Sequence, residues 1–178
     1  ESGQYKEGKG LLEKSLMTFK KKLSEEHTYI TWALAHLGII YRELGDYDKA
    51  KNFFEKSLKR CEKYDGKNSV KTAYILRNLG HTYLLEGNTD VAENLIIKSL
   101  DTFYQNKHPE SFKALESLAE VYLKKSIDFA NKGDTQVSQK FKTQALNSLK
   151  QSLVIVKTHF PKKSPHVARI QSKLQNLE

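Results

Sequence analysis

Few residues of this chain have the types and spacing that catalysis or metal binding requires. The single cysteine, Cys61, stands at no spacing that would pair it with a histidine base, and neither His36 nor His81 has a third metal ligand at a recognisable spacing. Gly8-Lys9-Gly10 is too short for a phosphate-binding loop, and there is no His-Glu-x-x-His motif. The sequence therefore predicts a protein that is not an enzyme and needs no cofactor or metal.

Cysteine usage and hydropathy indicate the compartment. A lone cysteine cannot form an internal disulfide, so we expect a reducing, cytoplasmic setting, or the cytosol of a host cell if the protein is delivered by a pathogen. We interpret Cys61 as a small, half-buried packing residue near the end of a helix. No stretch approaches the apolar length of a membrane span, and no signal peptide is visible. The chain starts inside a repeat, which we interpret as a fragment of a longer protein.

The net charge of +9 and the pI of about 9.4 raise the question of an anionic partner. Most lysines are spaced as on a solvated helix face and alternate with acidic residues, as in the segment from Asp48 to Glu62. The denser runs are Lys20-Lys21-Lys22 and Lys162-Lys163. A binder of nucleic acids or anionic surfaces is therefore the alternative function, and we do not expect nucleic acid to be the main partner.

A regular register recurs along the chain. Leu16, Leu58 and Leu100 are 42 residues apart, and a Leu-Gly-x-x-Tyr motif advances by the same 42 residues from Leu37 to Leu79. A constant period of this size is typical of stacked helical repeats, in which each unit is a pair of helices. We call the two helices of a pair helix A and helix B. Such arrays act as binding surfaces more often than as enzymes.

The first complete repeat shows the expected plan of a pair. Helix A is predicted from about residue 31 to residue 44, Gly45 takes the left-handed position that ends it, and either Asp46 or Asp48 caps helix B. The same reasoning applies to the second repeat, where Gly87 ends helix A.

Small residues in this repeat predict how closely the two helices pack. Gly38 of helix A and Ala50 of helix B are expected to face one another, with Phe54 filling the space beside them. Because the small side chains allow a close approach, a bulky residue at position 38 should push the pair apart.

The third repeat departs from the period. Leu118 follows Leu79 by 39 residues, and Leu153 follows Leu100 by 53, which leaves 14 residues beyond the plan. Divided over helices A and B, they add about two turns to each. The break between the helices falls at residues 131–134, and we expect a lengthened, protruding hairpin.

The register divides the chain within a single domain, residues 1–178. The amino end carries a helix B without its partner, and its apolar face is expected to self-associate. Leu174 stands where Leu37 stands in its repeat, which predicts a lone helix A that caps the array. The predicted segments are a truncated repeat at 3–26, repeats at 27–64, 65–106 and 107–160, and a terminal capping helix at 161–178.

These motifs resemble the tetratricopeptide repeat over essentially the whole chain. The usual repeat of that family has about 34 residues, and the longer form found here is similar to the repeat of kinesin light chains. His108-Pro109-Glu110, before a helix A containing Leu118-Ala119-x-x-Tyr122, is the closest local match; Asp65-Gly66 and His27-Thr28 replace the proline turn elsewhere. The resemblance implies an all-α fold, a right-handed superhelical array of antiparallel helix pairs.

The resemblance also implies a function, because the family binds a peptide or partner protein in a concave groove lined by helix A. Its two-lysine carboxylate clamp has no counterpart here, since Ala35 and Arg77 stand at the comparable positions. The predicted groove residues are Trp32, His36, Ile39, Arg42, Tyr74, Arg77, Asn78, His81, Lys113, Glu116, Ser117, Glu120, Arg169 and Lys173.

Each groove residue has a simpler structural alternative. Trp32 either lines the groove or packs against the preceding helix, since tryptophan is usually well buried. Arg77 either holds a ligand carboxylate or pairs with Glu116 of the next repeat. His36 and His81 are groove or packing residues rather than metal ligands.

Overall fold

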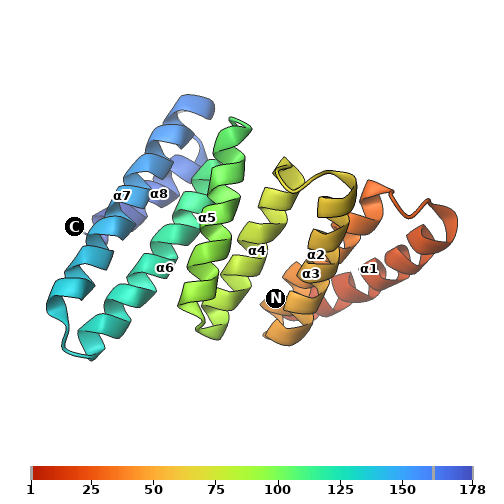
Figure 1. The fold of residues 1–178 in the computed structure, drawn as a ribbon, viewed down its shortest axis with the longest axis horizontal. Helices are drawn as coiled ribbons and strands as arrows, with labels where there is room; N and C mark the ends of the chain where they lie inside the picture. Colours follow the sequence, from red (N-terminus) through yellow and green to blue (C-terminus); the bar gives the residue numbers. More distant parts are fainter. Residues whose placement is uncertain (1, 162, 178) are drawn as a thin grey trace. The chain divides into compact units, whose positions relative to one another are not determined.

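The computed structural model describes residues 2–161 and 163–177, and all regular secondary structure in this part of the chain is helical (Figure 1). Lys162 of the carboxy-terminal lysine run lies outside the described residues. The chain divides into two compact units, one up to Asn88 and one from Thr89 onward. The helices are α1 (Ser2–Lys22), α2 (Thr28–Glu43), α3 (Tyr47–Tyr64), α4 (Val70–Glu86), α5 (Thr89–Gln105), α6 (Ser111–Asn131), α7 (Thr135–His159) and α8 (Pro165–Gln175).

Side-chain caps and one glycine set the ends of α2 and α3. The Nδ1 atom of His27 accepts a hydrogen bond from the backbone N–H of Tyr29 at 3.3 Å, which starts α2 three residues before the predicted position. Gly45 has φ 79° and takes the predicted left-handed conformation. Asp46, rather than Asp48, caps α3, because its carboxylate accepts the N–H of Lys49 at 3.2 Å.

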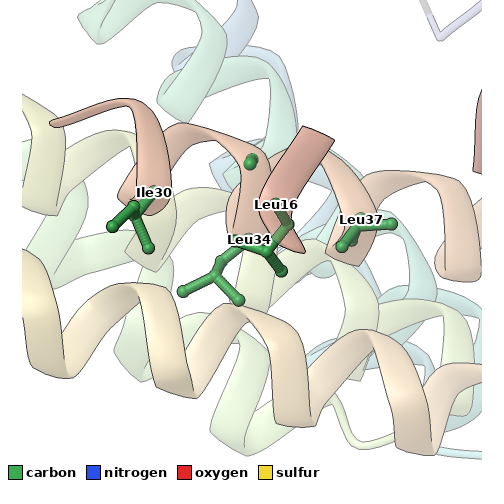
Figure 2. Packing of buried hydrophobic residues seen from close by; sticks show 5 residues of the cluster. Leu16, Ile30, Leu34 and Leu37 are labelled. Carbon is green, nitrogen blue, oxygen red and sulfur yellow. The ribbon is translucent and has the colours of Figure 1, made fainter. Parts of the chain in front are cut away.

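The first unit is built around the interface of α1 and α2. Leu16 of α1 packs with residues of α2 in one buried cluster, which includes Ile30, Leu34 and Leu37 (Figure 2). The α2 residues recur every three or four positions, so they share one helix face. The outer face of α1 exposes apolar side chains, and the predicted self-association through this end stays a prediction.

The pair formed by α2 and α3 shows the predicted close approach. Phe54 is fully buried, and a Cβ atom added to Gly38 would lie 2.9 Å from its ring, closer than real carbon atoms pack. The prediction that Phe54 fills the space beside Gly38 is therefore confirmed. A buried hydroxyl adds a polar link, because Ser57 of α3 donates to the backbone carbonyl of Thr31 in α2 at 2.9 Å.

The second unit repeats this link between α6 and α7. Ser152 of α7 donates to the backbone carbonyl of Phe112 in α6 at 3.0 Å, and both residues are fully buried. Ala145 and Leu149 of α7 are buried on the same side of the helix. The serine that recurs in the sequence register thus has a structural role, which the sequence analysis did not assign.

The lengthened hairpin is present, but its extra residues are divided unevenly. The helices α4 and α5 have 17 residues each, whereas α6 has 21 and α7 has 25. The expectation of two added turns in each helix is wrong for α6, which gains about one turn. The break lies where it was predicted, with Gly133 at φ 82° and the carboxylate of Asp134 accepting the N–H of Val137 at 3.0 Å.

Aromatic rings stabilise the far end of this hairpin. The ring of Phe141 in α7 stacks on Phe129 and on Tyr122 of α6, with centroids 5.5 Å and 6.1 Å apart. Ser126 donates to the backbone carbonyl of Ser138 at 2.8 Å across the same two helices. The added turns therefore have a small core of their own.

Substitution of Gly38 tests the close approach of α2 and α3. We expect Gly38→Leu to lower the free energy of unfolding by about 1 to 3 kcal/mol, because the new side chain overlaps the buried ring of Phe54. Urea denaturation followed by circular dichroism measures the change. The matched control is Gly10→Leu in α1, where an added Cβ meets nothing within 4 Å. A better helix former at that site should stabilise the chain by up to about 1 kcal/mol. Equal effects of the two substitutions would contradict the steric argument.

Cys61 provides a test of packing in α3. Its side chain is fully buried rather than half-buried, and this burial, with the negative charge of Asp65 adding to it, raises the thiol pKa from 9.0 to about 11. Below pH 9 the buried thiol is neutral and its packing contributes fully to stability; this contribution is lost as the pH rises towards 11. At pH 8 we expect a thiolate-specific reagent to modify the folded chain at least about 100-fold more slowly than the urea-unfolded chain. Similar rates in both states would show that Cys61 is accessible.

Candidate functional site

In the first unit, the predicted groove residues lie on α2 and α4, which contact each other directly. Trp32 of α2 meets Tyr74 of α4 edge to face, with ring centroids 5.2 Å apart. The guanidinium of Arg77 lies 5.5 Å from the centroid of the same tyrosine ring. His36 is exposed one turn after Trp32, at a ring distance of 6.4 Å. These four side chains form a continuous aromatic and basic surface, which we call the α2–α4 surface.

An open apolar pocket of about 270 Å³ adjoins this surface. Trp32 and His36 line it from α2, together with Tyr29, whose side chain is 56% exposed. Leu12 and Phe19 line it from α1. Trp32 thus satisfies both alternatives drawn from the sequence, since it packs beside the preceding helix and also lines a pocket. Sequence reasoning missed the α1 residues, although their seven-residue spacing places them on one helix face.

Asn78 is occupied by bonds within the protein. It is 3% exposed, its Nδ2 donates to the backbone carbonyl of Tyr74 at 2.8 Å, and its Oδ1 accepts from Nη1 of Arg42 at 3.3 Å. Arg42 also donates to the carboxylate of Glu43 from Nε and Nη2. The amide therefore joins α4 to α2, a role that the sequence analysis did not foresee. Ile39 and His81 are half-buried on the same two helices.

In the second unit, the predicted groove charges pair with one another between α6 and α8. Glu116 is 5% exposed and accepts from Nη2 and Nε of Arg169 at 2.5 Å and 3.2 Å. Lys173 lies 3.4 Å from the carboxylate of Glu116 and 2.9 Å from that of Glu120. Residues 53 positions apart in the chain thus form one ion-pair cluster, which we call the α6–α8 cluster.

The α6–α8 cluster affects the titration of Lys173. Partial burial of the ammonium group acts to lower its pKa, but the hydrogen bond to Glu120 and the charges of both carboxylates outweigh that effect. The pKa of Lys173 is consequently raised above its ordinary value of 10.5, and the ion pairs persist at neutral pH. An adjacent pocket of about 210 Å³ is lined by apolar residues of α6 and α7, among them Leu123 and Leu149.

The remaining predicted groove residues of this unit also have local partners. Lys113 forms an ion pair with Glu110 at 2.8 Å, and Ser117 is 6% exposed. The pairing of Arg77 with Glu116, suggested as an alternative, stays a prediction. Within the described residues, no helix is long and apolar enough to cross a membrane, and no group of three or more histidine, cysteine or acidic side chains could hold a metal ion.

Comparison with known families decides the class of this fold. A family model described as tetratricopeptide repeat matches residues 1–63 and 31–105, which together make up more than half of the chain. The chain belongs to the tetratricopeptide repeat family. Proteins of this family are in general protein-interaction scaffolds rather than enzymes. A search of curated protein sequences finds no match to this tetratricopeptide chain.

Solved structures confirm the predicted all-α fold. A putative kinesin light chain from Podosopora anserina, with nearly identical TPR-like repeats, superimposes with a TM-score of 0.69 at 18% identity. The match covers 98% of this chain and 78% of that one. BtubC (BKLC) from P. vanneervenii matches with a TM-score of 0.58 at 17% identity, over 98% of this chain and 73% of that chain. The repeats are thus of the kinesin light-chain type, as the sequence predicted.

Glu116 tests the α6–α8 cluster. We expect Glu116→Gln to lower the free energy of unfolding by about 1 to 3 kcal/mol, because the substitution removes the buried charge that accepts from Arg169. Hydrogen exchange of the α8 backbone amides should accelerate in this variant. Glu120→Gln is the matched control; its side chain is 39% exposed and should matter much less. Unchanged exchange in both variants would show that the cluster does not hold α8.

Proposed function

We propose that the α2–α4 surface binds a peptide segment of a partner protein, with an apolar side chain of the peptide in the pocket beside Trp32. Membership of the tetratricopeptide family supports a protein partner. The single observation that carries the proposal is the position of Trp32, which lines the apolar pocket and also touches Tyr74. Large aromatic side chains beside a pocket are the usual energetic centres of peptide interfaces.

The chemistry of the surface indicates what kind of peptide fits. The pocket of about 270 Å³ has room for a large apolar side chain, and the exposed ring of Tyr29 can cover part of it. Arg77 stacks on Tyr74 and supplies a positive charge beside the aromatic rings. We therefore expect an apolar residue, with an acidic residue a few positions away in the same peptide.

The other predicted groove residues have different parts in this proposal. Arg42 and Asn78 are positioning residues, because their mutual bond links α2 to α4 under the binding surface. In the second unit the charges of Glu116, Glu120, Arg169 and Lys173 neutralise one another, so a ligand would have to displace an existing ion pair. We accordingly place the main binding energy in the first unit.

Selected peptides test this proposal. Random 12-residue peptides that bind the wild-type chain are selected from a display library, and their affinities are then measured by fluorescence polarisation against Trp32→Ala. We expect affinity to fall by at least about tenfold, as for an anchor residue at the centre of an interface. A charge reversal at Arg77 should weaken the peptides that carry an acidic residue and spare those without one.

Tyr104→Ala is the matched control, because Tyr104 is an aromatic residue of α5 that is 46% exposed and does not line the pocket. It should leave peptide affinity unchanged. Circular dichroism of each variant checks that the fold persists. Peptides that bind Trp32→Ala as tightly as the wild type would show that the α2–α4 surface is not the binding site.

A further inference from the structure

A second pocket in the first unit has a different character. It encloses about 250 Å³ and lies where α1, α2 and α3 meet. Ile30 and Leu34 of α2 supply its apolar lining, and every other lining residue is a cation. It shares no lining residue with the pocket beside Trp32. We call it the basic pocket; its cations are Lys20 of α1 and Lys56, Lys59 and Arg60 of α3.

The charges around the basic pocket are not neutralised by neighbouring carboxylates. Elsewhere in this unit lysines do have acidic partners, as Lys49 does in Asp46 and Lys71 does in Asp65. Within residues 2–161 and 163–177, none of the four cations of the basic pocket forms an ion pair with a carboxylate. Four positive charges therefore gather around one small cavity, which favours the binding of an anion.

Arg60 provides the more specific observation. Its Nε and Nη2 atoms are buried, and neither donates a hydrogen bond to any part of the chain that the structure describes. The guanidinium lies 5.3 Å from the centroid of the Tyr64 ring, so one face is covered. The Nε and Nη2 hydrogens lie along one edge of the guanidinium plane, the edge that binds two oxygens of an oxyanion side by side.

The helix dipole does not account for this arrangement. Cations near the carboxy-terminal ends of helices are stabilised by the dipole, which explains Lys20 in the last turn of α1. The dipole supplies no acceptor for the buried edge of Arg60. Donors that lose water without gaining a partner cost free energy, so their retention needs another cause.

We propose that the basic pocket binds a phosphate monoester group. Such a group carries close to two negative charges at pH 7 and has three acceptor oxygens. Two oxygens would accept from the Nε and Nη2 edge of Arg60, and the third would lie among the lysine ammonium groups. A carboxylate has one charge and two oxygens, and a nucleic-acid phosphodiester has one charge, so each would leave more of the four cations uncompensated.

The test uses the Arg60 side chain as its own reporter. The ¹⁵N-labelled chain is titrated with inorganic phosphate and with O-phospho-L-serine, and the Nε–H resonance of Arg60 is followed by NMR. We expect this resonance to move with saturable dependence on ligand concentration. Arg60→Lys keeps the charge but loses the two-donor edge, and should weaken binding roughly tenfold.

Two lysine variants separate a local site from the overall charge. Lys59→Ser removes an exposed cation of the pocket, and Lys140→Ser removes an exposed cation of α7, so both lower the net charge equally. Only Lys59→Ser should weaken phosphate binding. Circular dichroism verifies that both variants fold. Equal effects of the two, an unmoved Arg60 resonance, or full binding by Arg60→Lys would each overturn the proposal.

Further ligands identify the source of the phosphate group. A phosphoserine peptide that binds at least about tenfold more tightly than O-phospho-L-serine would indicate a phosphorylated partner protein. Equal affinities would indicate a free phosphorylated compound. The same peptide with glutamate in place of phosphoserine is the chemical control, and equally tight binding of that peptide would exclude the phosphate assignment. Because the basic pocket and the α2–α4 surface share no residues named for binding, Arg60→Lys and Trp32→Ala distinguish failure of one proposal from failure of the other.

Discussion

The structure depends on how closely helix A and helix B of a pair can approach. At Gly38 the backbone of α2 lies against the ring of Phe54, and no side chain larger than hydrogen fits between them. The buried serine hydroxyls of Ser57 and Ser152 then bind a carbonyl near the start of the facing helix, which sets the position of one helix along the other. Close contact and a polar link together leave each pair little freedom to slide. Everything that lies on helix A inherits its position from this pairing.

Sequence periodicity was sufficient for the fold because it reports directly on this pairing. The 42-residue step placed small residues, turn glycines and the core leucines correctly, and these interactions join neighbours in the chain. The exact caps and the division of the added turns were harder to predict. His27 as a cap of α2 and the unequal lengths of α6 and α7 depend on local backbone geometry, for which the periodic pattern carries little information.

The candidate site was predicted in outline only, and the reason is physical. Membership of a helix A face follows from spacing, but whether a polar group on that face remains available depends on what stands opposite. Asn78 is occupied by Arg42, and Glu116 by Arg169, across 36 and 53 residues of sequence. Such long-range partners have no periodic signature. The same holds for the basic pocket, whose cations come from two helices that the sequence shows only as scattered lysines.

The long hairpin of α6 and α7 also affects how the second unit opens. A 17-residue α5 cannot cover the full length of the 21-residue α6, so roughly the last 6 Å of α6 depends on α7 alone for packing. The small aromatic core around Phe141 is then the main resistance to fraying there. The end of the hairpin is thereby a local unfolding unit, free to open and close while the helices beneath it stay folded.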